Sequence, residues 1–508
     1  MKLFRSAFAA HPGVMLLCLG LLATILLRVP HYQHAHTFVD ESIYTSTASE
    51  LLNGKALYSE VWCNHMPLAV YFCKWMFQLF GANSNAIHLG SLFLALLTLL
   101  LLYLIGSRFF SSRVGGLAAL AFAVISLNYY TPRIIGYTPE QLTVVFATSA
   151  VFIFLHSWIE NRSSGFFLVG LFSMAAVFSK PSAVPEAIMF LLVLTFAAGR
   201  NKGRGILWLV SGIVSGIVLL LLTLQQSASL DAWWHQSFLS RIEYVNQISI
   251  FDLFRIGARQ LTGFGLIFLW LWILIWSGRK GITSSGFAGR FLWIWLAATL
   301  AGVAMGRRFY ANYYIQMFPV LSLMAALAVD QMLRGGIRDR HKWAATASMI
   351  LLSMTFLWFH ARTLAHWYFF IDPEAHQKTE MWQMCVIDRN MKAVADKIRS
   401  VTKHDDTIFV WGPSPEFYFL SNRRMATRYP FFDVYDLAQP PYGDEEQHTL
   451  ELLKKSPPSL IVDNFREVRL TDRSGWDALL IQHYTLLMDD WEVRLYLLKG
   501  EMTVKTEQ

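Results

Sequence analysis

Long apolar runs decide what this chain of 508 residues can fold into. Many of its segments are apolar for about 18 residues or close to that, which as a helix crosses a hydrocarbon core of about 30 Å. A chain with many such runs is a polytopic membrane protein. We expect about eleven transmembrane helices, near residues 12–28, 86–106, 114–130, 141–158, 165–179, 185–199, 205–224, 261–277, 291–305, 313–333 and 343–360.

Charged residues are scarce, at 15% of the chain against about 25% in soluble domains. This excludes a water-soluble globular enzyme. The net charge of +8 does not indicate a nucleic-acid partner, because Lys and Arg fall in short clusters between apolar segments and not on one amphipathic face. The four cysteines lack the spacing of a zinc site or a disulfide framework. Whether Cys63 and Cys73 pair depends on the compartment that they face.

The short basic loops set the orientation of the helices in the lipid bilayer. Lys2 and Arg5 precede a first apolar run that lacks a small-residue cleavage site and is therefore a retained span. With this N-terminus in the cytoplasm, alternate loops are short and basic, as the positive-inside rule requires. Their cations are Arg108, Arg113, Arg162, Arg200, Lys202, Arg204, Arg279, Lys280, Arg290, Arg334, Arg338, Arg340 and Lys342. The other loops are longer and richer in Trp, Tyr and Pro, so we place them outside.

The tail changes composition sharply, which divides the chain into a membrane domain over 1–362 and a soluble domain over 363–508. An odd number of spans places this tail on the outer side, in the same compartment as the loop 29–85, so that the two can cover one site. Periodicity predicts a small α/β domain. Its expected elements are a helix over 381–400 and strands over 407–411, 459–462, 484–488 and 493–498, the last two forming a hairpin.

The first outer loop carries an acidic pair. Asp40 and Glu41 precede apolar residues at helical spacing, and Asn53-Gly54 ends the segment. Carboxylates at the start of a helix are favoured by capping and by the helix dipole, so the pair has a purely structural interpretation. The pair also lies just outside the first span, where it is well placed to meet the head group of a lipid substrate.

Motifs along most of the chain resemble the GT-C glycosyltransferases, most closely the branch of protein O-mannosyltransferases and lipid A aminoarabinose transferases (glycosyltransferase family 39-like). The outer-loop residues that carry this resemblance are Asp40, Glu41, Leu51, Leu52, Gly54, Tyr58, Pro67, Leu68, Tyr71, Phe77, Leu79, Phe80 and Gly81. Later segments agree in order and sidedness: 136–140, 178–181, 307–314 with Pro319, 410–412 and 418–421.

The resemblance implies a GT-C fold and a sugar transfer from a polyprenyl-phosphate donor to an acceptor hydroxyl on the outer face, with inversion at the anomeric carbon. By match to the family's catalytic acid, Asp40 is the candidate general base, and Glu41 is its helper or only a cap. Glu140 is a second acidic candidate, because it begins the fourth expected span after Pro139. An interfacial helix start explains Glu140 as well.

Cations at the outer ends of the spans are candidates to hold the donor phosphate. They are Lys180, Arg133, Arg241, Arg307 and Arg308. Each also has the ordinary interpretation of a side chain that extends to the lipid head groups. Arg307 and Arg308 stand out because hydroxyls of Tyr310, Tyr313 and Tyr314 follow them, although an aromatic belt at the interface explains those tyrosines too.

Two further outer-loop residues, Tyr58 and His65, are candidate substrate-binding residues. Relatives of the aminoarabinose-transferase type have Lys-Pro-Pro where this chain has His65-Met66-Pro67, and that lysine is expected to bind the donor phosphate. His65 can replace the lysine as a hydrogen-bond donor, but it is cationic only in part at neutral pH.

We expect no cofactor. The convergent carboxylates that a divalent metal needs are not evident in the sequence. The reaction is therefore predicted to be metal-independent, with Asp40 and Glu140 as the ligands if a metal is bound.

Other protein classes compete with this interpretation. A flippase or transporter of lipid-linked sugars is expected to carry ionisable residues near the bilayer midplane, whereas here the acids gather at the outer edge. A polysaccharide polymerase or ligase normally has its large loop between spans, and a receptor or scaffold needs far fewer spans. The resemblance further implies a bacterial inner membrane facing a periplasm. The acceptor (glycolipid, glycan or protein) and the sugar (hexose, pentose or amino sugar) stay open.

Overall fold

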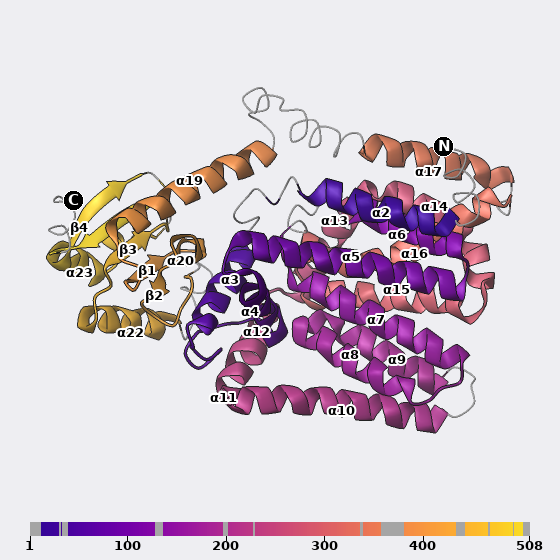
Figure 1. Ribbon diagram of the computed structural model, residues 1–508, viewed down its shortest axis with the longest axis horizontal. Coiled ribbons are helices and arrows are strands. Elements are labelled where there is room, and N and C mark those ends of the chain that lie inside the picture. Colours follow the sequence, from indigo (N-terminus) through magenta and orange to yellow (C-terminus); the bar gives the residue numbers. More distant parts are fainter. Residues whose placement is uncertain are drawn as a thin grey trace.

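The structure is a computed structural model in which a helical part and a small sheet part lie side by side (Figure 1). It describes residues 12–29, 32, 39–126, 136–196, 202–226, 229–335, 339–356, 380–432, 442–465, 468–490 and 492–500. The sequence predictions for Lys2, Arg5, Arg133, Arg200 and Arg338 fall outside these residues.

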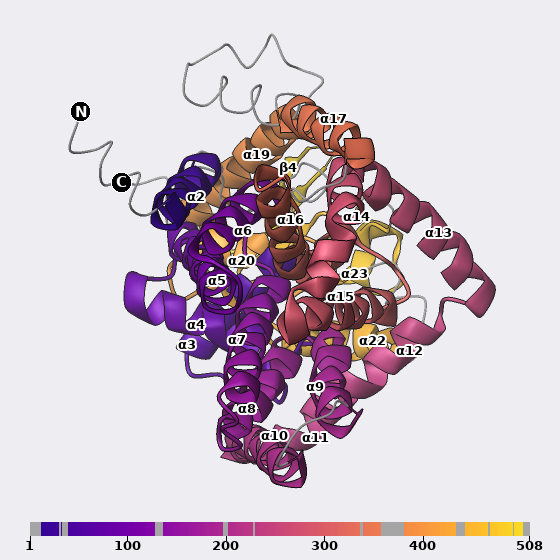
Figure 2. The same ribbon diagram turned by 90° about the vertical axis from the view of Figure 1, so that its right-hand side faces the viewer.

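Every apolar run of the sequence forms a helix, and these helices pack side by side (Figures 1 and 2). They are α2 (Pro12–Arg28), α5 (Ser84–Phe109), α6 (Ser112–Ile125), α7 (Pro139–Ile159), α8 (Gly165–Ser179), α9 (Val184–Phe196), α10 (Lys202–Gln226), α13 (Ile250–Ile267), α14 (Leu269–Ser284), α15 (Gly286–Met305), α16 (Phe318–Leu333) and α17 (Asp339–Phe356). Small residues allow close contact: a Cβ on Gly116 of α6 would lie 2.4 Å from the Gly13 carbonyl oxygen of α2. Such contacts are typical of helices packed in membranes.

The expected number of eleven spans is not confirmed. Among the described residues, 5 helices are long and apolar enough to cross a membrane, or 6 if α13 and α14 form one span bent by 80°. The apolar helices α2, α6, α8 and α9 are shorter. The predicted run 261–277 is interrupted at Phe268, which lies between the two bent helices.

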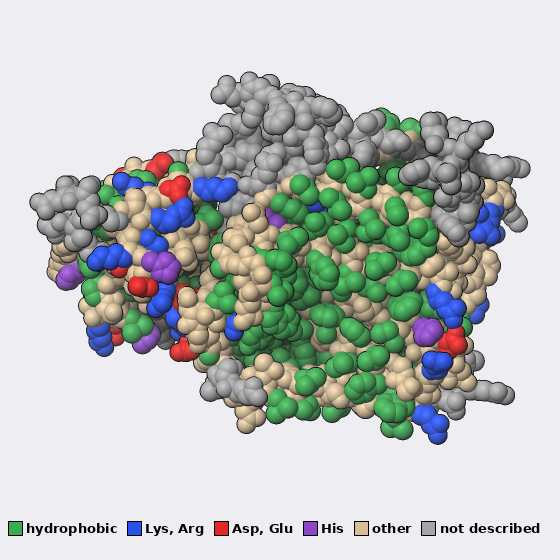
Figure 3. All heavy atoms as spheres, in the orientation of Figure 1, with side chains coloured by type: hydrophobic (Ala, Val, Ile, Leu, Met, Phe, Trp, Pro, Cys, Tyr) green, Lys and Arg blue, Asp and Glu red, His purple; other side chains and the backbone are tan. Residues whose placement is uncertain are grey.

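The surface of the helical part fits a lipid bilayer. Apolar side chains cover it broadly, while charged side chains gather on the sheet part and at the opposite end of the helices (Figure 3). Two of the basic residues predicted for the cytoplasmic side flank the turn between α5 and α6: Arg108 lies in the last turn of α5 and pairs with Glu160, and Arg113 lies in the first turn of α6 and pairs with Asp330.

Shorter helices connect the long ones at the end that faces the sheet part. The first outer loop forms α3 (Val39–Leu52) and α4 (Pro67–Phe80). The remaining connections contain η3 (Pro181–Ala183), α11 (Leu230–Trp233), the π-helix η4 (Trp234–Leu239), α12 (Ser240–Asn246) and the 3-10 helix η5 (Ala311–Met317).

The tail folds around a five-stranded sheet of order β2-β1-β3-β5-β4. Its strands are β1 (Thr407–Trp411), β2 (Arg424–Met425), β3 (Leu460–Asp463), β4 (Tyr484–Asp489) and β5 (Arg494–Leu498), and its helices are α19 (Glu380–Val401), α20 (Glu416–Ser421), α22 (Tyr442–Lys455), η8 (Leu470–Asp472) and α23 (Trp476–His483). The four expected strands and the antiparallel β4–β5 hairpin are confirmed. β1 pairs in parallel with β2 and β3, and the short strand β2 was not predicted.

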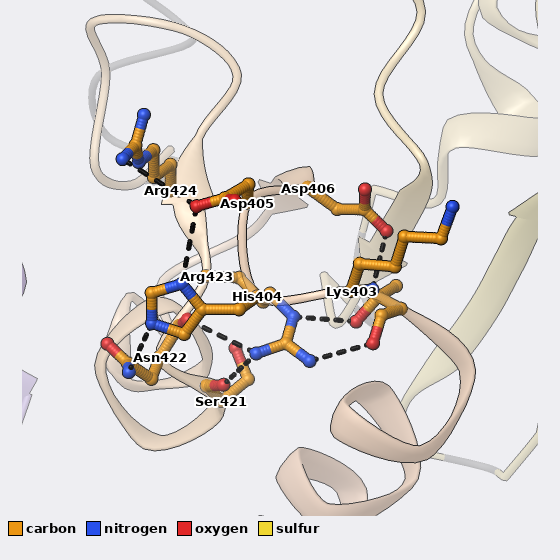
Figure 4. Close-up of polar contacts among 9 residues, drawn as sticks. Lys403, His404, Asp405, Asp406, Ser421, Asn422, Arg423 and Arg424 are labelled. Carbon is orange, nitrogen blue, oxygen red and sulfur yellow. Dashed lines mark hydrogen bonds and ion pairs between the residues drawn. The ribbon is translucent and has the colours of Figure 1, made fainter.

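Arg423 forms hydrogen bonds at the C-terminal ends of two helices of the tail, α19 and α20. Its guanidinium donates hydrogen bonds to Thr402 Oγ1 and to the Thr402 and Ser421 carbonyls at 2.8, 2.8 and 2.9 Å (Figure 4). Thr402 directly follows α19 and Ser421 is the last residue of α20, where a helix leaves its last carbonyls without partners. Arg423 therefore fixes the two helices to each other.

The tail is docked on the first outer loop. Ser46 Oγ of α3 donates to the Pro415 carbonyl at 2.7 Å, and Glu50 of α3 accepts from the Met425 N–H at 3.0 Å. Loop and tail therefore lie on the same side of the helices, as the sequence predicted.

Aromatic contacts extend this interface. The rings of Phe77 and Phe419 stack at 5.3 Å, and the Trp62 N–H donates to the Arg428 carbonyl at 2.9 Å. Trp62 belongs to the same buried cluster as the aromatic core of the tail. The first outer loop is thus enclosed between the long helices and the sheet part.

Candidate active site

The acidic pair begins α3, where the helix dipole favours carboxylates. Asp40 is half-buried, whereas Glu41 is completely buried. Glu41 accepts a hydrogen bond from the Tyr137 N–H at 3.0 Å and shares another with His88 Nε2 at 3.1 Å. Glu41 therefore joins α3 to α5 and to the segment before α7, whereas Asp40 keeps partial access to solvent.

Glu140 lies in the first turn of α7, directly after Pro139, and is completely buried. One carboxylate oxygen contacts Lys180 Nζ and accepts from Asn312 Nδ2 at 2.6 Å. The other oxygen, Oε2, has no hydrogen-bond partner among the described residues. Glu140 therefore connects α7 to the C-terminal end of α8 and to η5.

Lys180 is the residue that follows α8. Its ammonium lies 3.7 Å from the ring centroid of Tyr313, a cation–π contact. Burial lowers the pKa of Lys180, although Glu140 and Asp40 act to raise it. The lysine is thus a half-buried cation held between the ring of Tyr313 and the carboxylate of Glu140.

A second cation, Arg241 of α12, is fixed to the loop before α4. Its Nε donates to the Asn64 carbonyl at 2.8 Å, and its NH2 group lies 3.1 Å from His65 Nδ1. The Tyr44 hydroxyl also lies 3.2 Å from this nitrogen. Because a guanidinium can only donate, Nδ1 of His65 is the acceptor and the ring proton lies on Nε2.

His65 is neutral in this environment. Burial lowers the pKa of His65 well below its ordinary value, and the charges of Arg241 and Lys180 lower it further. The histidine therefore does not take the place of a lysine as a cation. The positive charges near this loop are those of Arg241 and Lys180.

The charged side chains of Asp40, Glu140, Lys180 and Arg241 act on the same neighbouring groups. Burial raises the pKa of Tyr44 well above its ordinary value, and the charges of Asp40 and Glu140 raise it further. Arg241 and Asp40 both act on Lys180 as well. We call Asp40, Glu140, Lys180 and Arg241 the charge cluster: it combines two carboxylates with two cations at the end of the helices that faces the tail.

Other residues singled out in the sequence lie elsewhere. Arg307 donates to the Ile248 carbonyl at 3.0 Å, and Arg308 donates to Gln247 Oε1 at 2.9 Å. Both cations are thus directed to the connection between α12 and α13.

The three tyrosines after these arginines differ in their surroundings. The ring of Tyr313 makes the cation–π contact with Lys180. Tyr314 is buried and stacks on Phe264 at 4.2 Å, and Tyr310 is 42% exposed with its ring edge toward Tyr313.

Tyr58 is completely buried, and its hydroxyl donates to the His65 carbonyl at 2.7 Å. Cys63 and Cys73 are both buried and free.

Several residues at the charge cluster were not identified from the sequence. Tyr44 lies one helical turn after Asp40, so its spacing was the available signal. Asn312 lies inside the 307–314 motif. Gln236 and Ser237 come from the π-helix η4, for which no sequence pattern was recognised: Gln236 binds the Tyr58 carbonyl and the Cys63 N–H, each at 2.9 Å.

No group of three or more His, Cys, Asp or Glu side chains gathers in the described part of the chain in a way that could hold a metal ion. The oxygen-bearing side chains of the site are those of Asp40, Glu140 and Asn312, which are the donor type that Mg²⁺ and Ca²⁺ take.

Residues 64–224 match the family described as dolichyl-phosphate-mannose-protein mannosyltransferase. This range contains His65, Glu140 and Lys180 and ends before Arg241. A comparison with curated protein sequences finds no match.

Two groups of solved structures share the fold. ArnT from Cupriavidus metallidurans bound to undecaprenyl phosphate matches with a TM-score of 0.62 at 14% identity, over 95% of this chain and 97% of that one. The oligosaccharyltransferase AglB from Archaeoglobus fulgidus, in complex with an inhibitory peptide and a dolichol-phosphate, matches with a TM-score of 0.55 at 12% identity, over 97% of this chain and 75% of that one.

Proposed function

We propose that this chain is a membrane glycosyltransferase of the GT-C superfamily, as its family match and fold neighbours support. It transfers a sugar from a polyprenyl-phosphate donor to a hydroxyl group of an acceptor, with inversion at the anomeric carbon. The observation that carries the proposal is the charge cluster: the half-buried cation Lys180 is held by the buried carboxylate of Glu140, and Asp40, which keeps partial access to solvent, acts on it electrostatically. The polyprenyl phosphates named with the neighbouring folds support a lipid-linked donor.

The cations of the cluster suit the leaving group. When the bond between the anomeric carbon and the phosphate oxygen breaks, its electron pair stays on the phosphate, which leaves as polyprenyl phosphate. A phosphate monoester with a second pKa near 6 needs no general acid at neutral pH. Lys180 and Arg241 stabilise the developing negative charge by charge-assisted hydrogen bonds that are already oriented.

The two carboxylates have different tasks in this reaction. Glu140 is completely buried and is engaged by Lys180 and Asn312, so it orients the cation. Asp40 is the general base: its carboxylate takes the proton of the acceptor hydroxyl as the new carbon–oxygen bond forms. That proton passes to solvent after the product leaves.

The partners and location follow from the same proposal. The acceptor is a glycolipid, a glycan or a protein, and the reaction takes place without a metal at the periplasmic face of a bacterial inner membrane. The N-terminus then lies in the cytoplasm and the tail in the periplasm. The contact of the tail with α3 supports a common compartment for the tail and the site.

Release of free polyprenyl phosphate tests the proposal. The purified protein in proteoliposomes is given polyprenyl-phosphate sugars and a membrane extract as acceptor source, and wild type is compared with Asp40→Asn. We expect the rate to fall by about 100-fold or more. Asp231→Asn is the matched control, because the same change is made at a side chain that is 93% exposed, and it is expected to keep the wild-type rate.

The outcomes test the class of protein and the assignment of Asp40 as the general base separately. Release that survives Asp40→Asn keeps the glycosyltransferase and transfers the role of base to Glu140. If wild type releases no polyprenyl phosphate with any donor while it moves a lipid-linked sugar between leaflets, the protein is a flippase. Release that requires a growing glycan as acceptor indicates a polymerase or ligase.

A further inference from the structure

The segment between α3 and α4 is held at Tyr58, whose φ of 70° lies in the left-handed region, which bulky residues rarely adopt. Its N–H donates to the Val61 carbonyl at 2.8 Å. Its carbonyl accepts from Gln236 Nε2 and from the Arg428 guanidinium, both at 2.9 Å. A backbone conformation of this kind persists only where its surroundings hold it in place.

Tyr58 transmits this restraint to His65. Its hydroxyl donates to the His65 carbonyl at 2.7 Å, and Ser237 Oγ donates to the same carbonyl at 3.1 Å. The position of Arg241 depends on the same short segment, because its guanidinium bonds the Asn64 carbonyl and the His65 ring. A displaced Tyr58 therefore displaces the two groups that orient Arg241.

Arg428 reaches this segment from the tail, 370 residues later in the sequence. Its side chain binds the Tyr58 carbonyl, and its own carbonyl accepts from the Trp62 N–H at 2.9 Å. The tail thus holds the segment at two points, four residues apart. One of these points is the carbonyl of the residue whose hydroxyl fixes His65.

We propose that Arg428 and Tyr58 are positioning residues for the donor phosphate, and that the tail thereby completes the donor site. Arg428 acts through Tyr58 and His65 on Arg241, and Arg241 contacts the phosphate. This inference rests on the proposed function, because it assumes that Arg241 binds the phosphate of a lipid-linked donor.

A double-mutant cycle tests the connection. The dissociation constant of undecaprenyl phosphate is measured for the full chain in lipid nanodiscs. We expect Arg428→Gln to weaken binding about tenfold, since it removes a charged hydrogen bond to a buried carbonyl. In an Arg241→Gln background the same change is expected to alter binding by less than about twofold, because residues that act as one unit are non-additive.

Three further variants sharpen the cycle. Arg428→Lys keeps a cation that can donate to one carbonyl, so it is expected to restore most of the affinity. Tyr58→Phe removes only the hydroxyl that holds His65, and it is expected to weaken binding as much as Arg428→Gln does. It takes the place of Arg428→Gln in the test if that variant does not fold. Arg424→Gln is the matched control, because the same change is made four residues earlier at an arginine that is 51% exposed and lies 3.9 Å from Asp405.

The results distinguish the two proposals. If wild type does not bind undecaprenyl phosphate, the proposed function fails and the positioning role fails with it. If wild type binds, but Arg428→Gln and Tyr58→Phe have no effect or weaken binding equally in both backgrounds, only the positioning role is overturned. A purely structural role of Arg428 predicts that equal loss.

Discussion

Two regions of the molecule contain cations that the sequence placed on the outer side as candidates for the donor phosphate, and it favoured Arg307 and Arg308 over Arg241. In the charge cluster, Lys180 pairs with Glu140, and Arg241 binds the loop before α4. In the turn after α15, Arg307 and Arg308 bind the connection between α12 and α13. The structure distinguishes the two regions by their partners: a carboxylate holds Lys180 in the first region, whereas carbonyl oxygens hold the two arginines in the second.

The backbone of the second region explains its different role. Arg307 and Phe309 have φ values of 54° and 51°, so the chain turns sharply there. Phe309 is buried, and a Cβ on Gly257 of α13 would lie 3.1 Å from its ring. The turn after α15 therefore has a packing task against α13, and its arginines stabilise that contact.

The largest expected effect comes from removing the cation that pairs with the buried carboxylate of Glu140. Lys180→Met leaves Glu140 as an uncompensated buried charge, and truncating one partner of such a pair costs about 2–5 kcal/mol. We expect sugar transfer to fall about 100-fold, measured as release of polyprenyl phosphate. Binding of the lipid phosphate should weaken together with it. A rate within a few-fold of wild type would contradict the proposed difference between the two regions, because Lys180 would then contribute no more to sugar transfer than the arginines after α15.

A smaller effect is expected from pH. Burial lowers the pKa of Lys180 below its usual value of 10.5, so the ammonium loses its proton as pH rises through that lowered pKa. Donor affinity should therefore fall on the alkaline side of the profile, at a lower pH than an exposed lysine would allow. In Lys180→Arg the cation persists, since the arginine pKa exceeds about 12, and the alkaline loss should disappear.

The acid side of the same profile checks His65. The pKa of His65 is lowered well below its ordinary value of 6.5. We therefore expect wild type and His65→Gln to show the same dependence of donor affinity on pH around pH 6.5. A dependence that is lost in His65→Gln would show that His65 binds the phosphate as a cation.

The smallest effect is expected in the second region. Arg308→Gln removes an exposed contact with Gln247, and we expect the KM for the donor to change by less than about twofold, as for other exposed pairs. Arg255→Gln is a suitable control, because its side chain is 73% exposed and pairs with Asp252 three residues away. A tenfold rise in donor KM confined to Arg308→Gln would return the turn after α15 to the substrate-binding machinery.

Local patterns in the sequence predicted most of the fold. Apolar runs gave the long helices, and alternation gave β1, β3, β4 and β5, because both signals depend on neighbouring residues. The break between α13 and α14 was missed, since the apolar run continues through Phe268. β2 was missed because it has only two residues.

Residues of the candidate site were predictable only where they belong to a recognisable sequence motif. Asp40, Glu140 and Lys180 were singled out in this way, and the structure brings them together. Gln236 and Arg428 were not, because each binds Tyr58 from a distance of 178 and 370 residues. No periodicity links such positions, so a single sequence cannot reveal their contact.

The docked tail also has a consequence for the order of synthesis. A ribosome delivers α3 and the loop around Tyr58 early, whereas β2 and Arg428 emerge about 370 residues later. At typical rates of about 5–20 residues per second, this interval lasts about 20–70 s. Throughout it the membrane helices can insert and pack while the loop lacks its second support. Assembly of the outer loop into its final form is therefore a late event in the life of each new chain.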